Sequence, residues 1–157
     1  MLANSYILEK DWITKSGFRA ACLLVRNKSH RCGYVEIPSD HFLYEIPYNQ
    51  PHPLLKEKWE QKEKKERGKR SVLLVLIYDP ENITPEIYFD VHGSLTYSDN
   101  LKGYPIDGES NWWIGFDCAH EGDASCSSID GIHRTLSYVE KECEALAQQI
   151  KDLENDS

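Results

Sequence analysis

The chain has 157 residues and a mass of 18.2 kDa, and 40% of its residues are hydrophobic and 28% charged. This size and composition predict one folded domain over residues 1–157, and they exclude a collagenous or intrinsically disordered chain. The net charge of −8 is uneven, because residues 71–157 hold 4 basic and 17 acidic residues, and such an acidic half argues against duplex nucleic acid as a partner.

No segment of the sequence predicts a membrane or secretory protein. The longest apolar run, from Val72 to Tyr78, is too short to cross a bilayer as a helix, and the first residues lack the basic and apolar regions of a signal peptide. Five cysteines occur without a Cys-x-x-Cys pair, which argues against a disulfide framework and a zinc ribbon. We therefore expect a cytoplasmic protein with reduced thiols and no membrane partner.

The first half of the chain predicts a hairpin, a loop and a helix. Residues 18–26 predict one strand, and residues 31–37 predict a second strand after a short turn-forming segment. Residues 39–53 hold three prolines and lack periodicity, so we expect an ordered loop there. Residues 54–70 interleave both charges at helical spacing, which predicts a charged helix exposed to solvent, the alternative being a basic patch for nucleic acid or an acidic partner.

Two further strands are expected in the middle of the chain. Residues 71–78 are a continuous apolar run, which is typical of a strand buried on both faces at the centre of a sheet. Residues 86–92 alternate, with Ile87, Phe89 and Val91 on the face that we expect to be core.

The last third predicts one strand and one long helix. Residues 112–118 alternate, so that Trp112 and Phe116 share a face opposite Trp113 and Asp117. Over residues 132–154, apolar side chains recur at steps of four and three, which predicts an amphipathic helix. Its apolar stripe suits either packing across a sheet or a coiled-coil homodimer, and we favour packing.

These segments together predict an α+β fold. It consists of a mostly antiparallel sheet with the C-terminal amphipathic helix packed on one face. The hairpin-length early connection and the absence of regular βαβ alternation favour antiparallel order.

Side chains that can bind a ligand gather at the expected strand ends. Segments 92–97 and 117–123 hold imidazole, hydroxyl and carboxylate groups, and a third group lies in and after the first hairpin. Burying so many polar and aromatic groups without a role would be costly, which favours a site. The candidate ligand-binding residues are His30, Arg31, His41, His92, Tyr97, Trp113, Asp117, His120 and Asp123.

A metal-dependent hydrolase is the alternative to a binding protein. Four of these residues offer imidazole nitrogen and carboxylate oxygen, a ligand set for a divalent metal ion that activates water. The spacing Asp-x-x-His-x-x-Asp matches no established helical metal motif. Cys32 or Cys118 could act as a nucleophile beside a histidine, although no nucleophile-elbow or protease signature surrounds either thiol. The candidate metal ligands are His92, Asp117, His120 and Asp123.

Two motifs carry a resemblance to a known group of proteins. Residues 92–97 are His-Gly-Ser-Leu-Thr-Tyr, and residues 112–123 are Trp-Trp-Ile-Gly-Phe-Asp-Cys-Ala-His-Glu-Gly-Asp. This pattern resembles a family of small uncharacterised phage and prophage proteins, over roughly residues 17–150, with Ser94 where the family pattern has glycine. The resemblance implies a phage or prophage origin and hence the host cytoplasm, but no particular activity. It also implies that the charged helix over residues 54–70 is an insertion relative to shorter members of the family.

The residues favour binding over catalysis. Proteins of such origin often act on host functions, including defence, so the resemblance implies a protein that binds a host factor or sequesters a small signalling molecule. For a nucleotide-like ligand, Trp113, Tyr97 or Tyr88 would stack on a base. Arg31 or Arg134 would then meet a phosphate. We expect a small polar ligand of this kind, with metal-assisted hydrolysis as the alternative.

Overall fold

A computed structural model describes most of the chain. The described residues are 6–25, 30–65, 82–101, 104–106, 111–118 and 135–155. The strands are β1 (Tyr6–Ile13), β2 (Arg19–Val25), β3 (His30–Ile37), β4 (Tyr97–Asp99) and β5 (Trp112–Asp117). The helices are α1 (Pro53–Lys65), α3 (Pro85–Tyr88) and α4 (Leu136–Asn155).

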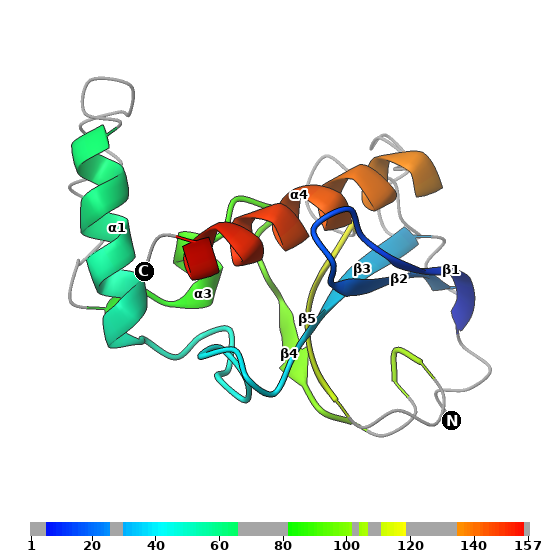
Figure 1. Cartoon of the computed structure of the whole chain (residues 1–157). Coiled ribbons are helices and arrows are strands. Elements are labelled where there is room, and N and C mark those ends of the chain that lie inside the picture. Colours follow the sequence, from blue (N-terminus) through cyan, green and yellow to red (C-terminus); the bar gives the residue numbers. More distant parts are fainter. Residues whose placement is uncertain are drawn as a thin grey trace.

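The five strands form one antiparallel sheet in the order β1-β2-β3-β5-β4 (Figure 1). The predicted hairpin is β2 and β3, in which Cys22 pairs with Gly33. The predicted strand at 112–118 is β5, which lies between β3 and the short edge strand β4. The predicted α+β class and the mostly antiparallel sheet are therefore confirmed.

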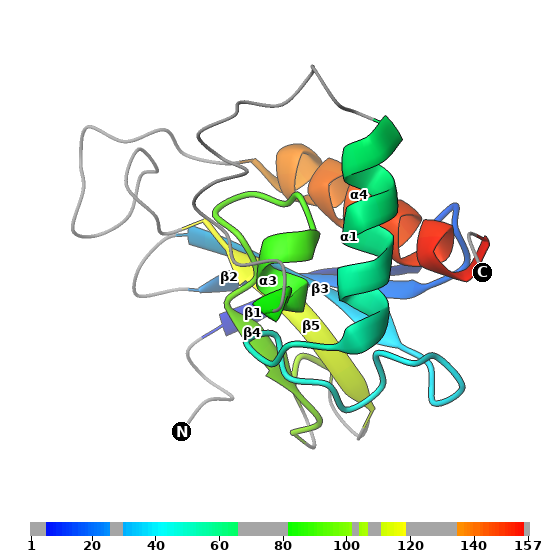
Figure 2. The same ribbon diagram turned by 90° about the vertical axis from the view of Figure 1, so that its left-hand side faces the viewer.

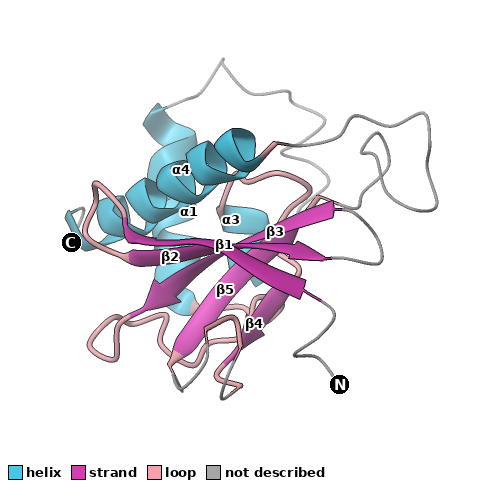
Figure 3. Ribbon diagram, turned by 90° about the vertical axis from the view of Figure 1, so that its right-hand side faces the viewer, coloured by secondary structure: helices cyan, strands magenta, loops and turns pink. Residues whose placement is uncertain are grey.

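Helix α4 lies across one face of the sheet and packs against β2 and β3 (Figure 3). Its predicted apolar stripe is buried in the same chain, since Val139, Cys143, Leu146 and Ile150 have no exposed surface. Packing, and not a coiled coil, therefore uses the stripe in this structure. Burial of each large aliphatic side chain contributes about 1.5–3 kcal/mol, which makes this layer the main source of stability.

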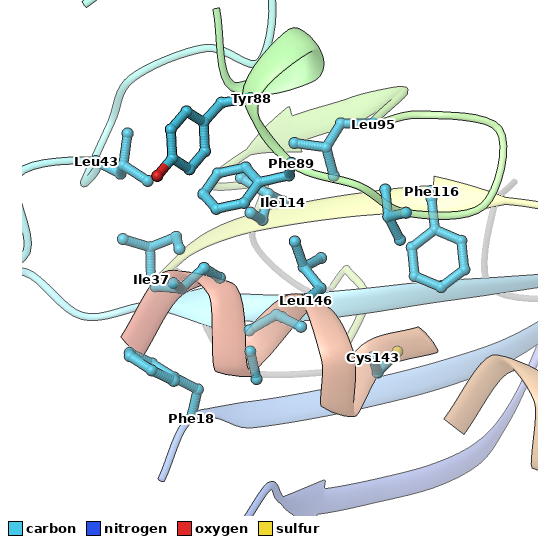
Figure 4. Close-up of a cluster of buried hydrophobic side chains, with 14 of the residues drawn as sticks. Phe18, Ile37, Leu43, Tyr88, Phe89, Leu95, Ile114, Phe116, Cys143 and Leu146 are labelled. Atoms are coloured by element: carbon cyan, nitrogen blue, oxygen red, sulfur yellow. The ribbon is translucent and has the colours of Figure 1, made fainter. Parts of the chain in front are cut away.

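The helix comes close to the sheet because β3 has a glycine beneath it. A Cβ atom at Gly33 would lie 2.5 Å from Cζ of Phe116 and 2.7 Å from Sγ of Cys143, closer than packed atoms approach. Figure 4 shows Cys143, Leu146 and Phe116 in the layer between α4 and the sheet. A side chain at this position would force the helix and the sheet apart.

Polar side chains of α4 fix the segments on both sides of it. Glu144 accepts a hydrogen bond from Nε1 of Trp12 in β1 at 2.8 Å. Glu142 accepts one from the backbone N–H of His92 at 2.8 Å. The helix therefore holds an edge strand on one side and the chain that leads to β4 on the other.

Helix α1 confirms the helix expected from residue 54, but it is not a solvated connector over its described length. Leu55 and Trp59 are buried in the core, and the Trp59 ring lies 6.4 Å from that of Tyr88 in α3. Figure 2 shows α1 standing beside α3 and α4. Residues 66–70 of the expected helix lie outside the described residues.

The strand expected over residues 86–92 is wrong, because residues 85–88 form the short helix α3. Thr84 caps this helix, with Oγ1 accepting from the N–H of Ile87 at 3.3 Å, and Pro85 occupies the first helical position. A threonine cap followed by proline is a helix-start signal, and here it overrides the period-two pattern of apolar residues. Phe89 and Val91 are still buried, as their alternation predicted, but in an irregular segment after the helix.

Two strands were not expected, and one expected strand cannot be located. β1 has no simple alternation, and its register shifts between Leu8 and Lys10. β4 has only three residues, too few for a periodic signal. The apolar run 71–78 lies outside the described residues.

The described residues also bear on membranes and thiols. None of the helices in the described ranges combines the length and apolarity that crossing a membrane requires. The four described cysteines are buried free thiols, namely Cys22, Cys32, Cys118 and Cys143. A hydrogen bond with Cys22, followed by burial, raises the pKa of the Cys143 thiol, which keeps it protonated.

Candidate ligand-binding site

The two faces of the sheet have different chemistry. On β5, Trp112 and Phe116 belong to the core cluster with α4, whereas Trp113 belongs to a second cluster on the opposite side. This division is the one that the alternation of residues 112–118 predicted. We call the side covered by α4 the helix face, and the opposite side the tyrosine face.

Four tyrosine rings pack together on the tyrosine face. Ring centroids lie 5.3 Å apart for Tyr34 and Tyr97, 5.4 Å for Tyr34 and Tyr104, and 5.5 Å for Tyr97 and Tyr104. The ring of Tyr6 meets that of Tyr104 edge-on at 5.2 Å, from the start of β1 (Figure 1). The hydroxyl groups of Tyr34 and Tyr104 share a hydrogen bond. Tyr34 is buried, and the other three are only half-buried, so the cluster borders solvent.

A second glycine makes this cluster possible. Tyr34, Gly115 and Tyr97 are cross-strand neighbours on β3, β5 and β4. A Cβ atom at Gly115 would lie 2.4 Å from Cδ1 of Tyr34. The Tyr34 ring therefore lies over the backbone of Gly115 and reaches Tyr97, which a larger residue would prevent.

The surroundings of the cluster keep its hydroxyl groups protonated. Burial, followed by the negative charge of Asp99, raises the pKa of Tyr97 well above 10. Burial raises the pKa of Tyr104 to about 12, although its hydrogen bond to Tyr34 acts in the opposite direction. Tyr34 itself has a pKa raised chiefly by burial. The cluster therefore presents neutral hydroxyls in a field of carboxylates.

Polar atoms of two members of the cluster on this face are buried without a partner among the described residues. They are Oη of Tyr97 and Nε1 of Trp113, and Trp113 has no exposed surface. An unsatisfied buried polar group costs about 1–3 kcal/mol, so two of them are a substantial loss for a small domain. On the helix face, Nε1 of Trp112 is also unpartnered, and Trp112 belongs to the core cluster that α4 covers.

The structure brings four of the predicted site residues to the tyrosine face. Tyr97 and Trp113 lie in the cluster just described. His30 pairs with Val25, whose side chain packs on the same face, and is itself buried. Asp117 accepts a hydrogen bond from Oγ1 of Thr96 at 3.3 Å and raises the pKa of Tyr104.

His92, by contrast, is turned toward the helix face. Its Nδ1 shares a hydrogen bond with Oη of Tyr138 in α4 at 2.8 Å, and the two rings meet edge-on at 5.4 Å. The turn before β4 makes this possible, because Gly93 and Ser94 both have positive φ angles, of 65° and 70°. Ser94 thus occupies a left-handed conformation that glycine adopts without strain, which is why glycine suits this position of the motif.

Arg31 and His41 also lie away from the tyrosine face. Arg31 follows the alternation of β3 to the helix face, where its Nε lies 2.7 Å from Oε1 of Glu9. His41 is buried in the loop after β3, and its Nδ1 accepts from the N–H of Leu43 at 3.1 Å. Burial lowers the pKa of His41, while the carbonyl of Ile150 and nearby carboxylates act in the opposite direction. Both side chains support the fold locally.

Two predicted ligand residues and one predicted phosphate contact cannot be located. His120, Asp123 and Arg134 lie outside the described residues. Among the residues that are described, no three histidine, cysteine, aspartate or glutamate side chains form a group that could hold a metal ion. The metal site with His92, Asp117, His120 and Asp123 stays a prediction.

Three members of the tyrosine cluster were not predicted as site residues. Tyr6 lies far from both motifs in sequence, Tyr104 lies between the two motifs and belongs to neither, and Tyr34 lies within the predicted hairpin. The alternation His30, Cys32, Tyr34 along β3 was the available signal, since it places these side chains on one face. Tyr88, expected to stack on a ligand, instead packs against Phe89 and Trp59 in the core.

Comparisons with protein-family models, with curated proteins and with solved structures find no match to this chain. The resemblance to phage proteins therefore stays a prediction based on the two motifs. The site must be interpreted from its own geometry.

Proposed function

We propose that this protein binds a small, flat, polar ligand, such as a nucleoside, on the tyrosine face. The observation that carries the proposal is the pair of buried, unpartnered polar atoms, Oη of Tyr97 and Nε1 of Trp113. A ligand that supplied an acceptor to the indole N–H and a partner to the hydroxyl would recover the free energy that these atoms lose on folding.

The neighbouring rings are suited to such a ligand. Half-buried tyrosines present both an apolar ring and a hydroxyl, and stacking of a base on an aromatic ring contributes about 1–3 kcal/mol. Tyr6, Tyr97 and Tyr104 are half-buried and can meet a ligand without unfolding of the sheet. A phage-encoded protein of this kind would sequester a nucleotide-like signal or a related host molecule.

The described residues give less support to hydrolysis. His92 is engaged with Tyr138 on the helix face, whereas Asp117 contacts Thr96 and lies near Tyr104. A metal centre built on this pair would need both side chains on one side of the sheet. We therefore retain binding as the proposed function and do not propose catalysis.

Isothermal calorimetry with a small panel of planar compounds tests the proposal. The panel consists of adenosine, guanosine, cytidine and nicotinamide, and the variants are Tyr97→Phe and, as a control, Tyr48→Phe. Both changes remove one hydroxyl, but Tyr48 packs against the helix-face core. We expect at least one compound to bind the native protein, with binding at least about tenfold weaker in Tyr97→Phe and unchanged in Tyr48→Phe.

Stability of the same variants provides a second readout. Because the Tyr97 hydroxyl is buried without a partner, its removal should leave the free energy of unfolding unchanged or raise it slightly. A hydroxyl that is needed for binding but not for folding would support the proposal. Absence of binding to every compound, or equal loss in both variants, would contradict it.

A further inference from the structure

We propose that the ligand of the tyrosine face carries a positive charge, as an alkylated or protonated ring nitrogen does, and that Glu36 and Asp99 select it. This inference rests on the proposed binding function and concerns the chemical class of the ligand. A site of this kind would bind cationic ring compounds in preference to phosphorylated nucleotides, although both contain a flat ring.

The strand register places a carboxylate on each side of Trp113. Trp113 of β5 pairs with Glu36 of β3 and with Asp99 of β4. Residues that pair directly across antiparallel strands project their side chains on the same face. The unpartnered indole of Trp113 is therefore flanked by two carboxylates on the tyrosine face, from two neighbouring strands.

The hydrogen-bond donors to these two carboxylates carry no positive charge that would compensate the negative charge. Glu36 accepts a hydrogen bond from the amide of Asn111 at 2.7 Å, and Asp99 accepts one from the backbone N–H of Asn100 at 2.7 Å. Both donors are neutral. Arg19 of β2 lies on the same face, next to β1. Its guanidinium donates two hydrogen bonds of 3.0 and 2.9 Å to the carboxylate of Asp11 in β1.

The aromatic rings favour the same sign of charge. A cation near the face of a tyrosine or tryptophan ring is attracted by the electrons of the ring, and more strongly where water is excluded. Burial is the main cause of the raised pKa values of Tyr97 and Tyr104, and the negative charges of Asp99 and Asp117, which add to it, would repel a phosphate. Arg31 cannot compensate, because it lies on the helix face and is paired with Glu9.

Three compounds that share one ring separate the possibilities. Nicotinamide is neutral at pH 7, 1-methylnicotinamide is a cation and nicotinate is an anion. Calorimetric titration of the native protein should give affinities in the order cation, neutral, anion, with about a tenfold step between cation and neutral compound. Sodium chloride should reduce this step, because the carboxylates border solvent.

Matched variants assign the preference to the site. Asp99→Asn should reduce the difference in affinity between 1-methylnicotinamide and nicotinamide, because it removes one of the two carboxylates beside Trp113. Glu60→Gln makes the same change of charge on the exposed surface of α1 and should leave this difference unchanged. If a neutral planar compound binds through Tyr97 but the cation binds no more tightly, the charge inference fails and the proposed function stands. If no planar compound binds in a Tyr97-dependent way, both fail.

Discussion

The two faces of the sheet are formed by the same strands but differ in chemistry: one packs against a helix, and the other holds a cluster of tyrosines. On the helix face, α4 buries an apolar stripe, and Gly33 lets it approach the sheet closely. On the tyrosine face, Gly115 allows a cluster of hydroxyl-bearing rings to form, with unpartnered polar atoms and carboxylates beside it. Trp112 and Trp113, adjacent in sequence, belong to opposite faces.

This difference separates stability from function. The helix face follows the rule for a folding core, in which large apolar side chains are enclosed at high packing density. The tyrosine face departs from that rule, because its unpartnered polar atoms lie beside half-buried, hydroxyl-bearing rings that border solvent. Departures of this kind are expected where a protein binds something, and changes on the two faces should therefore have different consequences.

The largest effect is expected in the centre of the helix face. Leu146→Ala removes a fully buried side chain from α4 and should lower the free energy of unfolding by about 2–5 kcal/mol. Urea denaturation followed by circular dichroism measures this change. Gln148→Ala, at an exposed position of the same helix, is the control and should change stability little; equal stability in the two variants would show that α4 does not pack as described.

The two glycines provide a matched comparison between the faces. Gly33→Ala places a methyl group against Phe116 and Cys143, and Gly115→Ala places one against Tyr34. Each should cost about 1–3 kcal/mol from overpacking, measured by denaturation. Gly115→Ala should also abolish ligand binding at a temperature where the protein is folded, whereas Gly33→Ala should not. Loss of binding in both variants would contradict the assignment of binding to the tyrosine face alone.

Residues on the helix side should lower the stability of the protein at acid pH, and residues on the tyrosine face should lower it at alkaline pH. On the helix side, burial lowers the pKa of His41 below its ordinary value of 6.5, so the unfolded chain holds this proton more tightly than the folded one. The stability that neutral His41 contributes is complete above pH 6.5 and is lost as the pH falls below it. His41→Asn keeps an acceptor for the N–H of Leu43 and should flatten the acid limb of a stability–pH curve. An unchanged limb would contradict this role.

The tyrosine face should respond to alkali instead. Tyr104 has a pKa raised to about 12, and the pKa values of Tyr34 and Tyr97 are raised well above 10. The unfolded chain therefore loses these protons first, and stability falls as the pH rises above about 10. Absorbance of tyrosinate measured soon after a jump to about pH 11, in the native protein and in variants with phenylalanine at Tyr34, Tyr97 or Tyr104, should show these three tyrosines still protonated. Uniform titration near pH 10 would show that the cluster is open to water.

The smallest effect concerns the turn that leads from the helix face toward β4. Ser94 has a φ of 70°, a conformation that costs a residue with a side chain about 1 kcal/mol relative to glycine. Ser94→Gly should therefore raise the free energy of unfolding by about 0.5–1 kcal/mol, measured by denaturation, without affecting binding on the tyrosine face. A decrease in stability would mean that the serine hydroxyl supports the turn.

Much of this architecture could be predicted from periodicity, and the failures have physical causes. The apolar stripe of α4 and the alternation of β5 repeat often enough to predict whether each segment is a helix or a strand and which of its side chains are buried. The strand expected at 86–92 failed because Thr84 and Pro85 start a helix within an alternating pattern. The tyrosine cluster was missed because Tyr6 and Tyr34 come from separate strands and Tyr104 from a segment outside the strands, and only the complete fold brings the three rings together.

The indole N–H signals of Trp112 and Trp113 test the central claim most directly. Both groups are buried without a partner, and they differ in the face to which they belong. In ¹⁵N–¹H spectra of the native protein titrated with the planar compound that binds most tightly in calorimetry, we expect the Trp113 signal to move in a saturable manner and the Trp112 signal to stay in place. Single substitutions to phenylalanine assign the two signals. A shift of Trp112 without Trp113, or no saturable shift of either, would contradict the assignment of binding to the tyrosine face.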